Sequence, residues 1–273
     1  MFNFLSENIF LTNAILAAVL ASVACGVNGT FIVVKRISYV GGGIAHAVMG
    51  GLGIAYFFNF NPLIGAAAFA IVSAVLIGLV KLKIKQNEDI AISALWAVGM
   101  AVGIIFAQLT PGYSVDLLSF LFGNILMVTK ESLRILLILD LAIVIFTFIF
   151  FRQIVYVIFD EEYAALRGIK VNLIYTSLLI SIALSVVVLV QTVGIILAIA
   201  LLTLPSASAS MFSNNLMKII FLSILFILVF AAVGLSFAFY ANIPAGAAII
   251  LAAGLGYLLT FFLKQISKKV MAK

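Results

Sequence analysis

His46 is the only histidine in this chain, and it lies inside a charge-free run that covers residues 37–80. Imidazole binds metal ions and carries protons, whereas hydrocarbon is an unfavourable environment for a polar ring. Glycines surround the histidine, with three in succession at residues 41–43, where neighbouring backbones could approach closely. The pattern therefore indicates a candidate ion or proton site. The alternative is a core histidine whose ring is hydrogen-bonded to a backbone carbonyl.

Two acidic residues next to apolar stretches are further candidates for chemistry. Asp116 begins an apolar segment at residues 116–128, and Asp140 lies within a later apolar stretch. An acid at the centre of a membrane costs roughly 2.5–3.5 kcal/mol on insertion scales, so such acids usually face a polar interior. We expect Asp116 either to line an ion pathway or to cap the start of its segment. For Asp140 the alternatives are a functional role and a side chain that reaches toward the interface.

The elements that must position these residues are membrane-spanning helices. The chain is 66% hydrophobic and 9% charged, and its mean hydropathy is +1.37. An average soluble domain has about a quarter of its residues charged, whereas a transmembrane helix needs about 20 apolar residues. The composition therefore predicts an all-α fold, a polytopic integral membrane helical bundle. The single cysteine, Cys25, excludes an internal disulfide framework and a cysteine-cluster metal site.

Charged residues and turn residues divide the chain into expected spans. The expected single spans are residues 9–34, 90–108 and 135–151, and the expected pairs of spans are residues 37–80, 171–217 and 219–263. The result is eight to nine transmembrane helices, with residues 116–128 as a short or re-entrant segment that lines a cavity. The positive-inside rule then places the N-terminus outside and the C-terminus in the cytoplasm, with Lys130 and Arg134 as exceptions.

A polar connector at residues 152–170 mixes charged and apolar residues. Its residues 156–169 predict a short cytoplasmic amphipathic helix that ends at Gly168. The acids of this helix, Asp160, Glu161 and Glu162, would suit docking onto a soluble partner. The alternative is an ordinary solvated loop.

Several sequence motifs are missing from the chain. It contains no phosphate-binding loop, no Ser-His-Asp set, no His-Glu-x-x-His and no haem-binding motif, so neither ATP hydrolysis nor an intramembrane enzyme is predicted. The net charge of +6 is explained by cytoplasmic loops and does not indicate a nucleic-acid partner.

Four segments, in order between residues 15 and 262, resemble the membrane permease subunit of the zinc/manganese class of ATP-binding-cassette importers, and zinc permeases most closely. The segments are residues 34–39 with 45–47, 115–118 with 121–126, 193–194 with 200–207, and 237–240 with 243–246. The resemblance implies a single permease domain over residues 1–273 that pairs with a second copy of itself in a prokaryotic cell membrane. It also implies two cytoplasmic ATPase subunits and an extracytoplasmic metal-binding protein, with no cofactor besides the transported metal.

The resemblance also implies roles for individual residues. In such importers the ion site uses the histidine of this segment and nearby acids, so His46 and Asp116 become the expected metal ligands. The expected residues that couple the permease to the ATPase are Asp160, Glu161, Glu162 and Gly168. Many members of the family have an aspartate four residues before the histidine, where this chain has Gly42. An Asp–His pair at this spacing lies on one helix face, and its loss favours zinc over manganese, which prefers oxygen donors.

The sequence therefore predicts the permease of an ATP-driven zinc importer. One alternative is an importer of the same class that carries manganese or iron. The other is a secondary transporter or channel driven by an ion gradient, with His46 as a proton relay. The few acids and bases within the spans make such a relay difficult to assemble.

Overall fold

The computed structural model describes residues 9–84, 88–110, 123 and 125–271. In these ranges the chain forms helices and no strand, and eight helices are long and apolar enough to cross a membrane. The predicted all-α membrane bundle is therefore confirmed. The elements are α2 (Ile9–Lys35), α3 (Ser38–Phe57), α4 (Pro62–Leu79), η1 (Val80–Ile84), α5 (Glu88–Leu109), η2 (Ile125–Met127), α7 (Lys130–Phe159), α8 (Glu161–Leu166), α9 (Val171–Val193), α10 (Ile195–Ser210), α11 (Leu216–Ala241) and α12 (Ala245–Met271).

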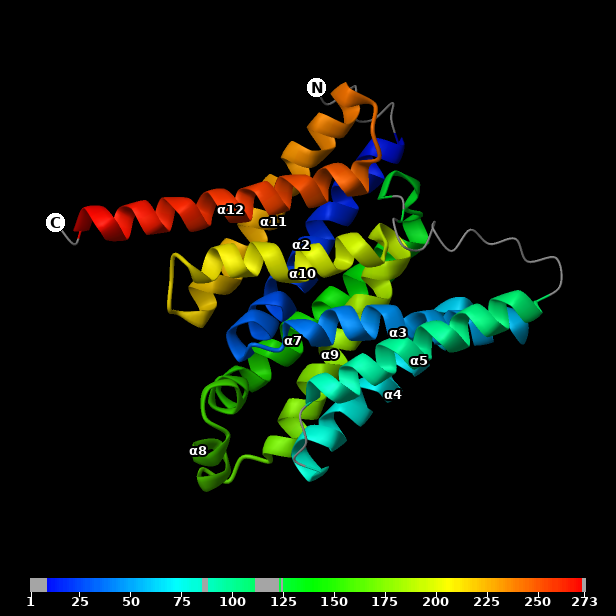
Figure 1. Cartoon of the computed structure of the whole chain (residues 1–273), viewed down its shortest axis with the longest axis horizontal. Coiled ribbons are helices and arrows are strands. Elements are labelled where there is room, and N and C mark those ends of the chain that lie inside the picture. Colours follow the sequence, from blue (N-terminus) through cyan, green and yellow to red (C-terminus); the bar gives the residue numbers. More distant parts are fainter. Residues whose placement is uncertain (1–8, 85–87, 111–122, 124, 272–273) are drawn as a thin grey trace.

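The helices form two groups on either side of α2 and α9 (Figure 1). One group is α3, α4 and α5, and the other is α10, α11 and α12. Between them, α2 contacts α7, α10 and α11, while α9 contacts α4 and α7. The helices α2, α3 and α9 are mostly buried, whereas fewer than a quarter of the residues in the spans of α5, α7 and α12 are buried. Such exposure is expected of helices that face lipid, because a lipid tail is as apolar as leucine.

Local sequence sets the helix ends that the turn residues predicted. At the start of α4, the Asn61 side chain accepts a hydrogen bond of 2.9 Å from the Leu63 backbone N–H, and Pro62 is the first helical residue. Asn242 caps the C-terminus of α11, and its left-handed φ of 53° turns the chain toward Pro244. The predicted turns at residues 59–62 and at Pro244 are both confirmed.

Three helices differ in length from the prediction, and one of them, α12, continues to Met271, beyond the expected end at residue 263. Helix α7 continues to Phe159, beyond the expected end at residue 151, because Ile154, Val157 and Ile158 are buried and extend its apolar face. Helix α10 has 16 residues and is about 24 Å long, which is less than the roughly 30 Å of a bilayer core. Its short length is tolerated because protein surrounds it on the sides of α2, α11 and α12.

Glycines bring α3 and α5 into backbone contact. A Cβ atom added at Gly99 of α5 would lie 2.5 Å from the Cα of Ala47, and one at Gly103 would lie 2.5 Å from the carbonyl oxygen of Met49. A side chain does not fit at either position, so this seam requires glycine. The many glycines of α3 disfavour a helix in isolation, and packing therefore holds this helix in place.

Candidate functional site

His46 lies on the side of α3 that faces α5, and its side chain is half-buried. Its imidazole stacks on the indole of Trp96, with the ring centroids 4.2 Å apart and the planes 5° from parallel. The Trp96 indole nitrogen in turn donates to the sulfur of Met100 at 3.2 Å. Stacking fixes the plane of the imidazole, and the nitrogen lone pair that binds a metal lies in that plane.

The edge of the His46 ring carries an unused polar atom. Nδ1 is buried and has no hydrogen-bond partner among the residues that the structure describes. The core-histidine alternative requires a hydrogen bond from this ring to a backbone carbonyl, and Nδ1 does not supply one within the described part of the chain. An unpartnered buried nitrogen is costly in a protein interior, which makes His46 well suited to accept an incoming cation.

The glycine one turn before His46 is not required by packing. A Cβ atom at Gly42 would meet Ile199 of α10 at 3.7 Å, which is an ordinary van der Waals contact. At the adjacent Gly43, the same atom would lie 2.2 Å from Cγ2 of Ile92, so a side chain does not fit there. A Cβ atom therefore fits at Gly42, which lies on the same helix face as His46.

Asp140 is buried at the interface of α7 with α2, where it lies near Ala24 and Cys25. It is 4% exposed, so its side chain does not reach toward the membrane surface, which was the second alternative from the sequence. No hydrogen bond of good geometry reaches either carboxylate oxygen within the described ranges, although the backbone of Ala24 lies beside the carboxylate. The structure does not bring Asp140 to His46, because His46 packs on α5 while Asp140 packs on α2.

The burial of the Asp140 carboxyl is expected to lower the stability of the fold. The variant Asp140→Asn is expected to unfold in detergent at a temperature about 2–5 °C higher, since burying a neutral amide costs less than burying an acid without partners. Differential scanning fluorimetry would measure the shift. An unfolding temperature equal to or below that of the unchanged protein would show that the buried Asp140 carboxyl does not destabilise the fold.

The four residues expected to couple the protein to an ATPase have different surroundings in the structure. Asp160 caps α8 by accepting a hydrogen bond of 2.9 Å from the Tyr163 backbone N–H. Glu161 points inward and is engaged with two lysines, whereas Glu162 is exposed. Gly168 has a φ of 76°, which ends the short helical segment as predicted. The predicted helix is present as α8, but it is shorter than the expected residues 156–169, because residues 156–159 belong to α7. Glu162 and Gly168 are both exposed.

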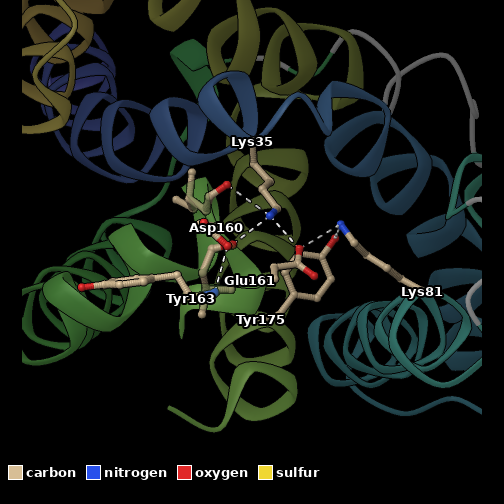
Figure 2. A network of polar contacts seen from close by, with 8 residues as sticks. Lys35, Lys81, Asp160, Glu161, Tyr163 and Tyr175 are labelled. Carbon is tan, nitrogen blue, oxygen red and sulfur yellow. Dashed lines mark hydrogen bonds and ion pairs between the residues drawn. The ribbon is translucent and has the colours of Figure 1, made fainter. Parts of the chain in front are cut away.

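Glu161 joins elements that are far apart in the sequence (Figure 2). Its Oε1 atom lies 2.6 Å from Nζ of Lys35, the last residue of α2, and 3.7 Å from Nζ of Lys81 in η1. Lys35 also donates to the backbone carbonyls of Val157 and Ile158 at 2.8 and 3.2 Å. These two carbonyls belong to the last turn of α7, where a cation is favourable.

Tyr175 of α9 completes this group. It is fully buried, and the Lys81 ammonium lies 4.4 Å from the centroid of its ring and donates to its hydroxyl at 3.3 Å. The structure thus joins α8 to α2, η1 and α9 through charged and aromatic contacts. We refer to Lys35, Lys81, Glu161 and Tyr175 as the Glu161 cluster.

Asp116, the second expected metal ligand, lies outside the described residues. Among the described residues no three His, Cys, Asp or Glu side chains gather into a group that could hold a metal ion. A cavity of about 130 Å³ lies between α3, α4 and α9, but it does not include His46. Its polar lining residues are Tyr56, Asn61 and Gln191.

Sequence reasoning did not identify Trp96 or the lysines of the Glu161 cluster as functional candidates. Trp96 is the only tryptophan in the chain, which was the one available signal for it. Lys35 lies within residues 34–39, one of the segments that carry the resemblance, but neither lysine has a local feature that indicates a contact with Glu161. Their contacts with Glu161 depend on tertiary structure, because 80 to 126 residues of chain separate the partners.

Comparisons with known proteins agree with the fold and the order of the elements. The family model described as the ABC 3 transport family matches residues 7–264. The membrane protein slr2045 of Synechocystis is 40% identical over 94% of this chain and 91% of its own length. The manganese transport system membrane protein MntC of Halalkalibacterium halodurans is 34% identical over 93% of this chain and 87% of its own length.

A solved structure extends this likeness to three dimensions. The structure described as PsaBC from Streptococcus pneumoniae in complex with Fab contains a chain that is 33% identical to this one. The two chains superpose with a TM-score of 0.86, and the match covers 99% of this chain and 98% of the other.

Proposed function

The chain belongs to the ABC 3 transport family, and on this basis we propose that it is the membrane-spanning permease subunit of an ATP-binding-cassette importer for a divalent transition metal ion. The observation that carries the proposal is the His46 imidazole, whose Nδ1 atom is buried and lacks a hydrogen-bond partner in the described part of the chain. Such a nitrogen offers a passing cation one ligand without first having to break a hydrogen bond.

A weak site suits transport, because a bound ion must also leave. His46 would supply a nitrogen ligand, and Asp116 would supply an oxygen ligand from the segment outside the described residues. Alternating access would open this site first to the outside and then to the cytoplasm, driven by ATP hydrolysis on separate subunits. The accessible side of α8, with Glu162 and Gly168, would dock on those subunits.

The remaining partners follow from the same proposal. A second copy of the chain would complete the membrane unit, and an extracytoplasmic metal-binding protein would deliver the ion. The positive-inside rule supports an orientation with Lys35, Lys81 and α8 in the cytoplasm, because their contacts hold them at one end of the bundle. The C-terminus would then be cytoplasmic in a prokaryotic cell membrane.

Manganese and zinc are each favoured by a different observation. The relative named MntC is a manganese transport protein, and this name supports manganese as the cargo. Gly42 removes an oxygen donor beside His46, and this chemistry supports zinc. The proposal therefore covers both ions, and competition between them decides which one is preferred.

The test is ATP-dependent uptake in proteoliposomes that contain the chain with its co-purified ATPase and binding protein. We expect radiolabelled Mn²⁺ or Zn²⁺ to accumulate only when ATP is supplied. Excess unlabelled Mn²⁺ or Zn²⁺ would then rank the two ions by competition. Uptake driven by an ion gradient without ATP would overturn the proposal in favour of a secondary transporter.

Substitutions at Gly42 test the metal preference of the ion site, because a Cβ atom fits at this position. The variant Gly42→Asp is expected to raise the ratio of Mn²⁺ to Zn²⁺ uptake roughly threefold or more, since it places a carboxylate on the face of α3 that carries His46. The matched control is Gly42→Ala, which makes the same change to the backbone without adding an oxygen. Equal ratios in the two variants would show that residue 42 does not contribute to the ion site.

A further inference from the structure

The Glu161 cluster lies between the accessible side of α8 and the helix that carries His46. We propose that Glu161 is a positioning residue that links α8 to the ends of α2 and α4, so that movement of α8 is transmitted to α3. This inference rests on the proposed function, because it assigns the outer side of α8 to the ATPase. It gives Glu161 a role that is distinct from docking.

The burial of α8 separates its two sides. On the inner side, Ala164 is fully buried and the Glu161 side chain is 34% exposed and paired with Lys35. On the outer side, Leu166 is 87% exposed and Glu162 is also exposed. A partner that binds the outer side would leave the ion pair of Glu161 in place. The carboxylate of Glu161 therefore acts toward the membrane helices and not toward the partner.

The first connection runs through Lys35 to α3. The side chain of Lys35 is 11% exposed, and Lys35 is the last residue of α2. It is followed by Arg36, which turns the chain with a φ of 64°, and then by Ile37, whose N–H donates to the carbonyl of Ile32 at 2.9 Å. Helix α3 begins at Ser38. Since the turn is tight and hydrogen-bonded, a displacement at Lys35 must also displace the start of α3.

The second connection runs through Lys81 to α4. Lys81 lies in η1, a π-helical turn that continues α4, and such turns are frequent at functional positions. Helix α4 packs directly on α3, so it supports the same helix from another side. The buried ring of Tyr175 holds Lys81 beside Glu161, because the ammonium lies over that ring. One carboxylate thus contacts the ends of two helices that flank α3.

The ratio of metal transported to ATP hydrolysed tests this link. Both quantities would be measured in the same proteoliposomes, which contain the complete chain with its ATPase and binding protein. The variant Glu161→Gln is expected to lower the ratio about fivefold while the ATPase still co-purifies and still hydrolyses ATP. A ratio within about 1.5-fold of the wild-type value, which corresponds to roughly 0.2 kcal/mol, would overturn the proposal. Loss of ATPase co-purification would also overturn it, because Glu161 would then be a docking residue.

Variants at Lys35 separate a positioning role from general damage to the fold. Lys35→Arg keeps the charge and the donors and is expected to retain most of the ratio, whereas Lys35→Met should lose it. Combining Lys35→Met with Glu161→Gln should cost clearly less than the sum of the two single effects, because both changes remove the contact between Lys35 and Glu161. Lys218→Met is the matched control, since Lys218 is exposed and forms no ion pair with the described residues. Additive losses in the double variant would contradict the link.

Hydrogen exchange separates failure of this link from failure of the proposed function. In the purified complex, Glu161→Gln is expected to increase amide exchange in α8 and, together with it, in residues 36–41 at the start of α3. This readout does not depend on the transported ion, so it is informative even if neither Mn²⁺ nor Zn²⁺ is taken up. Faster exchange in α8 with unchanged exchange in residues 36–41 would overturn the proposal. In the Lys218→Met control, exchange in both segments should stay as in the wild type.

Discussion

Replacement of His46 with alanine is expected to lower ATP-dependent metal uptake about tenfold or more, with assembly of the protein unchanged. A tenfold loss corresponds to about 1.4 kcal/mol, which is a modest value for one bond between a metal and an imidazole. The half-buried position of His46 means that a small cavity at this position should be tolerated. Initial uptake rates in proteoliposomes, compared at equal protein content, would measure the loss.

A second substitution at the same residue separates metal binding from stacking. His46→Phe keeps an aromatic ring against Trp96 but has no nitrogen, so it should lose uptake as fully as His46→Ala. Trp96→Phe keeps a stacking partner for the imidazole and is expected to retain most of the uptake. If His46→Phe transports metal like the wild type, the ligand assignment is wrong and the ring serves packing alone.

The sequence predicts the membrane helices well because their determinants are local. Apolar length defines each span, and residues such as Asn61 and Pro62 set a helix start through contacts within two or three positions. Helix α10 was harder to predict because its residues are as apolar as those of a span. Its shortness depends on the turn at Gly194, which has a φ of 87°, and on burial between other helices.

The candidate site is only partly predictable, because its contacts join distant segments. His46 stands out in the sequence as a polar residue in an apolar run, but nothing local indicates that Trp96 covers its ring. Glu161 was expected to face a soluble partner, since an acid in a polar connector is usually solvated. Its actual partners, Lys35 and Lys81, become close only after α2, η1 and α8 are packed together.

Two adjacent glycines in α3 also differ in ways that only the tertiary structure shows. Gly42 and Gly43 are indistinguishable in sequence, yet a Cβ atom at Gly42 would meet Ile199 at an ordinary 3.7 Å, whereas one at Gly43 would lie 2.2 Å from Cγ2 of Ile92. Small residues in membrane helices permit close packing, but the sequence does not tell which of them are in contact. The three-dimensional structure supplies that distinction and so identifies which glycines can be changed.

Substitution of a glycine at the contact between α3 and α5 is expected to lower the stability of the protein strongly. Gly99→Ala adds a Cβ atom that would lie 2.5 Å from Cα of Ala47, the residue that follows His46. Both helices must separate, and overpacking of this kind typically costs about 1–3 kcal/mol, occasionally more. We expect the unfolding temperature in detergent to fall by about 5–10 °C. Metal uptake should fall as well, because Trp96 lies one turn before Gly99 and would be displaced from His46.

The matched control is Gly254→Ala in α12, where the structure describes no atom within 4 Å of the added Cβ. Alanine favours a helix over glycine by up to about 1 kcal/mol, so this control should unfold at the same or a slightly higher temperature. The same propensity gain acts in Gly99→Ala, and a net loss there must therefore come from the contact with Ala47. If both variants unfold at the wild-type temperature, α3 and α5 are not held together by this seam. The orientation of His46 would then need another support.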